Sequence, residues 1–295
     1  MPHDLWTVIL AAGAGRRLQE VTGGIPKQFW RADGGPSLLE QTMDRFDPLT
    51  PRSRTVVIVN TDHLKHVRAT DGAESGPVLV TQPEDRGTAA GVLLALTPVM
   101  EHAPESTVIV TPSDHGVLDG AKFRHGVLDA ATDARDRIVL FGVEPTRAHT
   151  DYGWISLGAS SAGGLRPVTS FIEKPAADLA ARLFASGAVW NTMVVVARAR
   201  ALWDLYVRRL PDLARVFAGV IERRGKERAR FLASAYRTLP ARDFSRDLLT
   251  GARGLSARVW PAAIGWSDLG TPERLRDWRA TVASRARPAA STSAA

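Results

Sequence analysis

Short apolar runs alternate with helical segments along the first half of the chain, and this alternation constrains the fold more than any other feature. Runs of this length and composition are typical of strands buried on both faces. The expected strands are 6–11, 55–59, 78–80, 107–110 and 138–143. The helices expected between them are 38–46, 88–100 and 123–134, and we expect Pro98 to close the second. This pattern predicts an α/β fold with a mixed, mainly parallel sheet.

The second half of the chain departs from this regular alternation. Further short strands are expected at 152–157, 168–172, 194–197 and 257–260. The segment 200–236 is predicted to be a helical insertion, interrupted near Pro211 and Gly225. A helix start is expected at 271–273. We therefore expect a single domain over 1–285, followed by a disordered tail rich in proline, alanine and serine over 286–295.

Composition narrows the classes of function. The chain has 295 residues, a formal net charge of +7 and no cysteine, which excludes disulfides, thiolate metal sites and cysteine nucleophiles. No apolar run is long enough to cross a bilayer and no signal peptide is recognisable, so we expect a cytoplasmic protein without a membrane partner. The basic segment 222–228 is broken by acids, which argues against a nucleic-acid partner. Positive charge also suits small polyanions such as nucleotides.

A glycine-rich turn with two arginines follows the first expected strand. In residues 10–18 (LAAGAGRRL) the glycines allow the backbone to approach a phosphate, and Arg17 at a helix entry can hold one. The turn is not a dinucleotide fingerprint, because Leu18 stands where the third glycine should be and the second strand ends in Asn60 rather than an acid. A nicotinamide oxidoreductase is therefore disfavoured, while a purely structural turn stays open.

Charged side chains stand at four other points where the chain turns. Asp114 follows the fourth strand, Asp268 precedes the last helix, Lys27 follows a proline, and Glu173-Lys174 ends a strand. Mg²⁺ prefers one or two carboxylates together with phosphate oxygens, so the two aspartates could share one ion. Each of these residues, taken alone, also fits a helix cap, a surface turn or a surface ion pair.

Taken in order, these and several other short motifs resemble the sugar-1-phosphate nucleotidyltransferases, and among them the mannose-1-phosphate guanylyltransferases. Each motif is modest, but their order and spacing agree over about residues 6–275. The motifs are LAAGAGRRL (10–18), PKQF (26–29), SLLEQT (37–42), QPEDRGTA (82–89), PSDH (112–115), FGVEPT (141–146), YGWI (152–155), FIEKP (171–175), WN (190–191) and WSDLG (266–270).

The resemblance implies a Rossmann-like nucleotidyltransferase core and a Mg²⁺-dependent reaction, in which GTP and mannose 1-phosphate give GDP-mannose and pyrophosphate. It implies that Arg17, Lys27 and Asp114 are catalytic, the first two on the triphosphate, and that Asp114 and Asp268 hold the metal. The implied nucleotide contacts are Ala11, Ala12, Gly13, Gly15, Gln82, Gly87 and Thr88. The implied sugar-phosphate contacts are Gly153, Glu173, Lys174 and Asn191.

The sequence departs from the family pattern at some of these sites. Ala12 replaces a usual glycine, Arg16 a usual threonine, Asp151 a frequent glycine, and Thr192-Met193 a frequent serine-glycine. Two alternatives therefore stay open. One is the same reaction with another nucleoside triphosphate or hexose 1-phosphate, giving a UDP-, dTDP- or ADP-sugar, and the other is a catalytically silent regulator that binds sugar nucleotides. We expect a single activity, because the chain ends soon after the WSDLG motif, and a homodimer is left open.

Overall fold

A computed structural model describes residues 4–32, 34–67, 76–134, 137–160 and 164–286 of the chain. The strands are β1 (Leu5–Leu10), β2 (Thr55–Asn60), β3 (Val78–Gln82), β4 (Thr107–Pro112), β5 (Gly116–Val117), β6 (Ile138–Val143), β7 (Gly153–Leu157), β8 (Arg166–Glu173), β9 (Val189–Arg198), β10 (Leu255–Trp260) and β11 (Trp266–Ser267). The α-helices are α1 (Gln19–Thr22), α2 (Leu38–Phe46), α3 (Gly87–His102), α4 (Gly120–Asp133), α5 (Ala177–Ala185), α6 (Ala199–Arg209), α7 (Pro211–Ile221), α8 (Gly225–Thr238) and α9 (Pro272–Ala286).

All of the predicted strands and helices are present, whereas α5, β5 and β11 were not predicted. The predicted tail falls outside the described residues except for Ala286, which ends α9. Among the described residues, no helix combines the length and the apolar character that a bilayer crossing requires.

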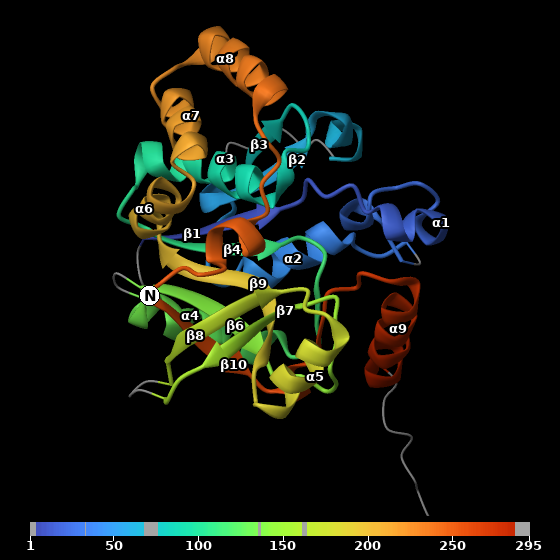
Figure 1. Cartoon of the computed structure of the whole chain (residues 1–295). Helices are drawn as coiled ribbons and strands as arrows, with labels where there is room; N and C mark the ends of the chain where they lie inside the picture. Colours follow the sequence, from blue (N-terminus) through green and yellow to red (C-terminus); the bar gives the residue numbers. More distant parts are fainter. Residues whose placement is uncertain (1–3, 33, 68–75, 135–136, 161–163, 287–295) are drawn as a thin grey trace, which may run out of the picture.

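Nine strands form one sheet in the order β3-β2-β1-β4-β9-β6-β10-β8-β7 (Figure 1). The strands β3, β2, β1 and β4 pair in parallel, as do β6 and β10. β9 runs antiparallel to β4, β6 and β7, and β8 runs antiparallel to β7 and β10. The mixed sheet is confirmed, but parallel pairing does not dominate it. Among the described strands of this sheet four pairings are parallel and five are antiparallel, because β8 and β9 run against their neighbours.

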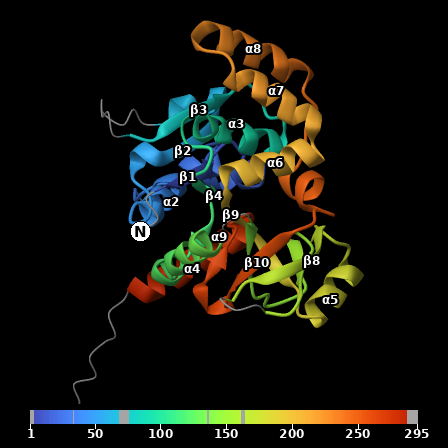
Figure 2. The ribbon, with the colours of Figure 1, turned by 90° about the vertical axis from the view of Figure 1, so that its left-hand side faces the viewer.

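Helices cover both faces of this sheet (Figures 1 and 2). Successive side chains of β1 show the two faces, since alternate residues of a strand point to opposite sides. Val8 packs in the cluster that contains α3, α6 and α7, and Ile9 packs against α2. The predicted helical insertion is confirmed as α6, α7 and α8, which connect β9 to β10. Figure 2 shows α8 on the outside of α7, away from the sheet.

Helix α2 begins and ends where the sequence predicts. Its first turn is a capping box, in which the N–H of Glu40 donates to the Ser37 hydroxyl at 3.2 Å and the N–H of Ser37 donates to the Glu40 carboxylate at 2.7 Å. Leu39, Met43 and Phe46 recur at helical spacing and are buried against the sheet.

The prediction that Pro98 closes helix α3 is wrong, because α3 continues through Pro98 to His102. Proline lacks the N–H that would bond to the carbonyl four residues earlier, here Leu94. The hydroxyl of Thr97 donates to that carbonyl at 2.8 Å and so supplies the missing donor. The surrounding residues of α3 are buried, and this packing stabilises the helix beyond the proline.

Candidate active site

The turn after β1 is held by side-chain donors that engage its carbonyl groups. The amide Nε2 of Gln28 donates to the carbonyls of Ala11 and Gly13 at 2.8 and 2.9 Å, and Nδ2 of Asn60 donates to that of Ala12 at 2.8 Å. No partner among the described residues accepts from the N–H groups of Gly13, Ala14 or Gly15. The turn thus presents free backbone donors, which is the property that an anion-binding loop needs.

A hollow of about 420 Å³ lies beside this turn. Its lining brings together residues that are far apart in sequence, namely Ala14, Gly15, Arg17, Leu18, Lys27, Asp85, Asp114 and Gly270. Gly15 can approach Lys27 only because it has no side chain. Its φ is +61°, and a Cβ would lie 2.9 Å from the backbone nitrogen of Lys27. The predicted catalytic residues Arg17, Lys27 and Asp114 therefore share one cavity with the free amides.

Lys27 joins the two predicted metal ligands. Its side chain is 8% exposed, and its Nζ lies 2.8 Å from Oδ2 of Asp114. The same ammonium group donates to the carbonyls of Asp268 and Leu269 at 2.7 and 3.2 Å. The carboxylate of Asp114 and the backbone of Asp268 therefore lie close together beside the cationic first loop, and the binding of one metal ion by both carboxylates stays a prediction. All three donors of Lys27 are engaged in this state, so none is free for a phosphate.

The carboxylate of Asp268 accepts hydrogen bonds from three of the described residues. Arg274 donates through Nη1 to both carboxylate oxygens at 2.6 Å, and the Tyr152 hydroxyl and Gly270 N–H donate to Oδ1 at 3.2 and 3.1 Å. Burial acts to raise the pKa of Asp268, but the hydrogen bond and charge of Arg274 and the positive form of His115 outweigh it and lower the pKa. Asp268 is thus kept as an anion.

The donor chemistry around Asp114 and Asp268 fits a magnesium ion. Both are carboxylates with partly exposed side chains, at 28% and 22%. Asp114 lines the hollow beside the loop amides, and so does Gly270, two residues after Asp268. Among the described residues no group of three or more histidine, aspartate or glutamate side chains converges. Mg²⁺ commonly takes only one or two carboxylates and completes its shell with water and phosphate, so two are sufficient.

The residues predicted to contact the sugar phosphate also lie together. Gly153 pairs with Glu173 across β7 and β8, and a Cβ on Gly153 would lie 2.6 Å from the Glu173 carboxylate and 3.3 Å from Cβ of Asn191. The ammonium group of Lys174 lies 3.4 Å from Glu173. Burial raises the pKa of Glu173, and the charge of Lys174 only partly opposes this.

Strained backbone marks the same places. Among the described residues, the non-glycine residues with positive φ are Lys174 at 48°, Met193 at 61° and Leu269 at 48°. They follow Glu173, Asn191 and Asp268 by one or two positions. Such conformations cost free energy and cluster at functional sites. Met193 stands where the family resemblance leads us to expect glycine, which adopts such a positive φ more readily.

The predicted base contacts Gln82, Gly87 and Thr88 differ in their exposure. Gln82 is buried, and its amide donates to Asn60 Oδ1 at 2.5 Å, which links it to the first turn. A Cβ on Gly87 would lie 2.2 Å from the carbonyl of Arg242, and the Thr88 hydroxyl accepts from the N–H of Phe244 at 2.8 Å. The segment 242–244 thus contacts Gly87 and Thr88, although Thr88 stays exposed. Neither residue lines the hollow, and their contact with a nucleotide stays a prediction.

Three residues near the site were missed by the sequence reasoning. Gln28 lies within a quoted motif but had no role, Asp85 lines the hollow, and Arg274 holds Asp268. Local sequence gave a weak signal for Gln28, which directly follows Lys27, and for Asp85, which lies within the quoted motif at 82–89. The partners of Arg274 could not be inferred, because one of them lies 123 residues away in the chain.

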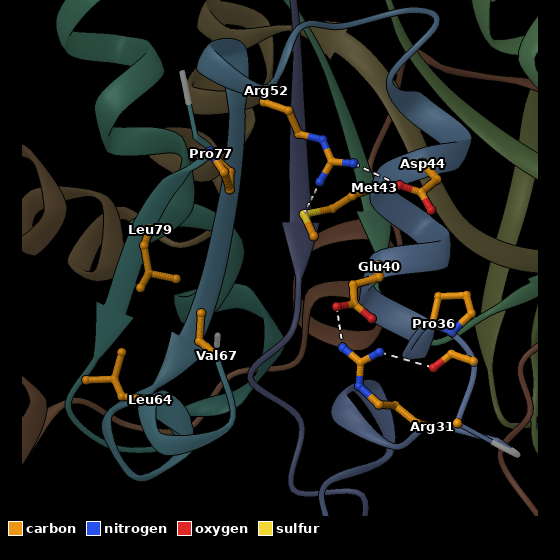
Figure 3. Close-up of a pocket in the computed structure, with 12 residues that line it drawn as sticks. Arg31, Pro36, Glu40, Met43, Asp44, Arg52, Leu64, Val67, Pro77 and Leu79 are labelled. Atoms are coloured by element: carbon orange, nitrogen blue, oxygen red, sulfur yellow. Dashed lines mark hydrogen bonds and ion pairs between the residues drawn. The ribbon is translucent and has the colours of Figure 1, made fainter. Parts of the chain in front are cut away.

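A second hollow of about 750 Å³ contains none of the predicted site residues. It lies between α2, the segment 64–67 and β3 (Figure 3). Its two arginines are already paired, Arg31 with Glu40 and Arg52 with Asp44 at 2.8 Å. Much of the remaining lining is apolar, including Leu64 and Leu79. The chemistry of this hollow therefore does not suit a phosphorylated substrate.

Comparison with known families decides the assignment. The sequence pattern described as nucleotidyl transferase matches residues 6–285, which is most of the chain. The chain belongs to the nucleotidyl transferase family. The nucleotidyltransferase family and the α/β fold expected from the resemblance are thereby confirmed.

Individual relatives agree with the nucleotidyl transferase assignment. Xanthan biosynthesis protein XanB of Xanthomonas campestris pv. campestris (strain B100) is 29% identical, and the match covers 93% of this chain and 59% of XanB. Mannose-1-phosphate guanylyltransferase of Escherichia coli (strain K12) is 29% identical, with 90% of this chain and 58% of the relative covered. A solved structure from Thermus thermophilus, described as a mannose-1-phosphate geranyltransferase, is 26% identical with a TM-score of 0.80, over 97% of this chain and 80% of that one. The chain thus spans about three fifths of the length of XanB and of the Escherichia coli relative.

Proposed function

We propose that this nucleotidyl transferase moves a guanylyl group from GTP to mannose 1-phosphate and releases pyrophosphate. One observation carries the proposal above all. The ammonium group of Lys27 reaches both Asp114 and the backbone of Asp268 beside a loop with free amides. A relative with 90% of this chain covered is named mannose-1-phosphate guanylyltransferase, which supports the choice of base and hexose.

The reaction brings two polyanions together, so the residues mainly position and neutralise charge. In this proposal the amides of the first turn and Arg17 bind the triphosphate, and Lys27 contacts it after exchanging its bond to Asp114 for one to a phosphate oxygen. Glu173 and Asn191 accept and donate hydrogen bonds with sugar hydroxyls, and Lys174 pairs with the sugar phosphate. An oxygen of that phosphate attacks the α-phosphorus, the bond to the bridging oxygen breaks, and the electron pair leaves with pyrophosphate. The attacking phosphate is largely ionised at neutral pH, so no general base is needed.

We also propose Mg²⁺ as the cofactor. Asp114 and Asp268 would hold it, and the bound ion would neutralise charge on the phosphate oxygens. The chain's own part is to keep both carboxylates ionised and close together, which the low pKa of Asp268 and the Lys27 contacts favour.

The choice of substrates is tested by a matrix of reactions. The protein is incubated with each of the four nucleoside triphosphates plus mannose 1-phosphate or glucose 1-phosphate, and pyrophosphate release is followed. We expect the highest kcat/KM with GTP and mannose 1-phosphate. A higher value for another pair would replace these substrates but keep the reaction. No release with any pair, together with binding of a sugar nucleotide, would favour a silent regulator instead.

A further inference from the structure

Arg274 joins the carboxylates of Asp151 and Asp268, which lie far apart in the sequence. Its side chain is 10% exposed and lies near the start of α9. Nη1 bonds to Asp268, and Nη2 lies 2.6 Å from Oδ2 of Asp151, which directly precedes Tyr152 at the head of β7. The guanidinium carbon lies 5.0 Å from the centre of the Tyr152 ring. Asp151 is one of the positions where this chain departs from the family pattern.

This arrangement places the charge of Arg274 directly on the carboxylate of Asp268. Arg274 bonds to both carboxylate oxygens, and Oδ1 also accepts from Tyr152 and Gly270. A metal ion that approaches either oxygen meets Arg274, the one donor among the described residues that both oxygens share. Arg274 is the donor that also carries a positive charge, so it is the one that a divalent cation would repel most strongly.

Asp151 supplies the second half of the arrangement. When Asp268 loses Arg274, the guanidinium needs another anion, because a partly buried and unpaired cation is costly. Asp151 already accepts from Nη2 and is more exposed, with a side chain 42% accessible. It can therefore keep Arg274 close to its present position without competing for Asp268.

We propose that Arg274 is a positioning residue that competes with the divalent cation for Asp268, and that Asp151 retains the guanidinium once Asp268 has turned to the metal. The proposal rests on the proposed function for the presence of a metal. It makes the site resistant to metal binding until a cation of sufficient charge, with or without its nucleotide, displaces the arginine. A simple scaffold role for Arg274 predicts the opposite, since its removal would then loosen Asp268 and weaken metal binding.

The test measures binding of Mn²⁺ by electron paramagnetic resonance in the absence of any nucleotide. We expect Arg274→Gln to bind Mn²⁺ about tenfold more tightly than the unmodified chain. We expect Asp151→Asn to bind it about threefold more weakly, because Arg274 then depends on Asp268 alone. In the double variant the Asp151 change should have no further effect. Arg276→Gln on the same helix controls for the loss of one positive charge. The side chain of Arg276 is exposed and makes no hydrogen bond or ion pair among the described residues.

Several results would overturn the proposal. Weaker or unchanged Mn²⁺ binding by Arg274→Gln would favour the scaffold role, and an equal gain in Arg276→Gln would show a general charge effect. A persistent effect of Asp151→Asn in the double variant would show that Asp151 does not act through Arg274. If Arg274→Gln fails to fold by circular dichroism, the single Asp151→Asn variant decides, and unchanged binding there contradicts the proposal. Shifts in Mn²⁺ binding without nucleotidyl transfer would overturn the proposed function alone.

Discussion

The ammonium group of Lys27 lies 2.8 Å from the carboxylate of Asp114, and the side chain of Lys27 is almost completely buried. The same nitrogen also bonds to the carbonyl of Asp268, 241 residues further along the chain. One cation, on the 3₁₀ turn at Lys27–Phe29, therefore connects the residue that follows β4 with the segment before α9. In the state described, Lys27 neutralises Asp114 and Arg274 neutralises Asp268.

Replacing Asp114 by asparagine tests its proposed contact with the reacting phosphates through a metal. Removal of one transition-state electrostatic contact typically lowers turnover by two to three orders of magnitude. We expect Asp114→Asn to lower kcat at least about 100-fold in a pyrophosphate-release assay. Asp277→Asn, an exposed residue of α9, should leave kcat unchanged. An Asp114 variant with the kcat of the unmodified chain would refute the role.

Lys27 is expected to matter for stability as well as for activity. The Lys27→Met variant leaves the carbonyls of Asp268 and Leu269 without their donor and Asp114 without its ion pair. A buried acceptor that loses its partner costs roughly 1–3 kcal/mol. We therefore expect the free energy of unfolding in urea to fall by about 2 kcal/mol, and kcat to fall as well. Lys65→Met, at an exposed position, is the control, and equal stability of the two variants would contradict this account.

Glu173 should give the stability of the protein a recognisable pH dependence. Burial raises its pKa above the ordinary value of 4.5, so the folded state binds a proton at a pH where the unfolded state does not. Ionisation of Glu173 therefore destabilises the fold as the pH rises through this raised pKa. We expect Glu173→Gln to be more stable relative to the unmodified chain at pH 7 than at pH 4, measured by urea unfolding. A difference that grows on acidification would contradict the direction of the shift.

Gly87 is expected to tolerate no side chain. Its φ is +80°, and a Cβ would lie 2.2 Å from the carbonyl of Arg242. Gly225 has a φ of +52° but open space around it, so it controls for the backbone cost alone. That cost is about 1–2 kcal/mol, and the backbone clash at Gly87 should add to it. We expect the melting temperature of Gly87→Ala to fall clearly below that of Gly225→Ala, and similar values would show that segment 242–244 moves away easily.

The sequence predicted those parts of the fold that depend on local chemistry. Helix α2 was predicted from its apolar spacing, and the two residues of its capping box, Ser37 and Glu40, lie only three positions apart in the chain. Asp114 was placed correctly at the end of a strand. The length of α3 was predicted wrongly, because the Thr97 hydroxyl and the packing around the helix outweigh the effect of Pro98.

The rest of the site depends on contacts between distant parts of the chain. The pairing of Arg274 with Asp151 spans 123 residues, and the cover over Gly87 comes from residue 242. Neither contact leaves a periodic pattern or a motif in the sequence. Asp151 was noticed only as a departure from the family pattern, and the structure supplies its partner.

The fate of isotopic label in GTP tests the central claim, nucleotidyl transfer, most directly. GTP labelled with ³²P at either the α- or the γ-phosphate is incubated with Mg²⁺ and mannose 1-phosphate, and the products are separated. We predict that the α-label appears in the sugar nucleotide and that the γ-label appears in pyrophosphate, in equal molar amounts. Appearance of the γ-label as free orthophosphate or on the sugar would contradict the account, because it would show hydrolysis or phosphoryl transfer instead.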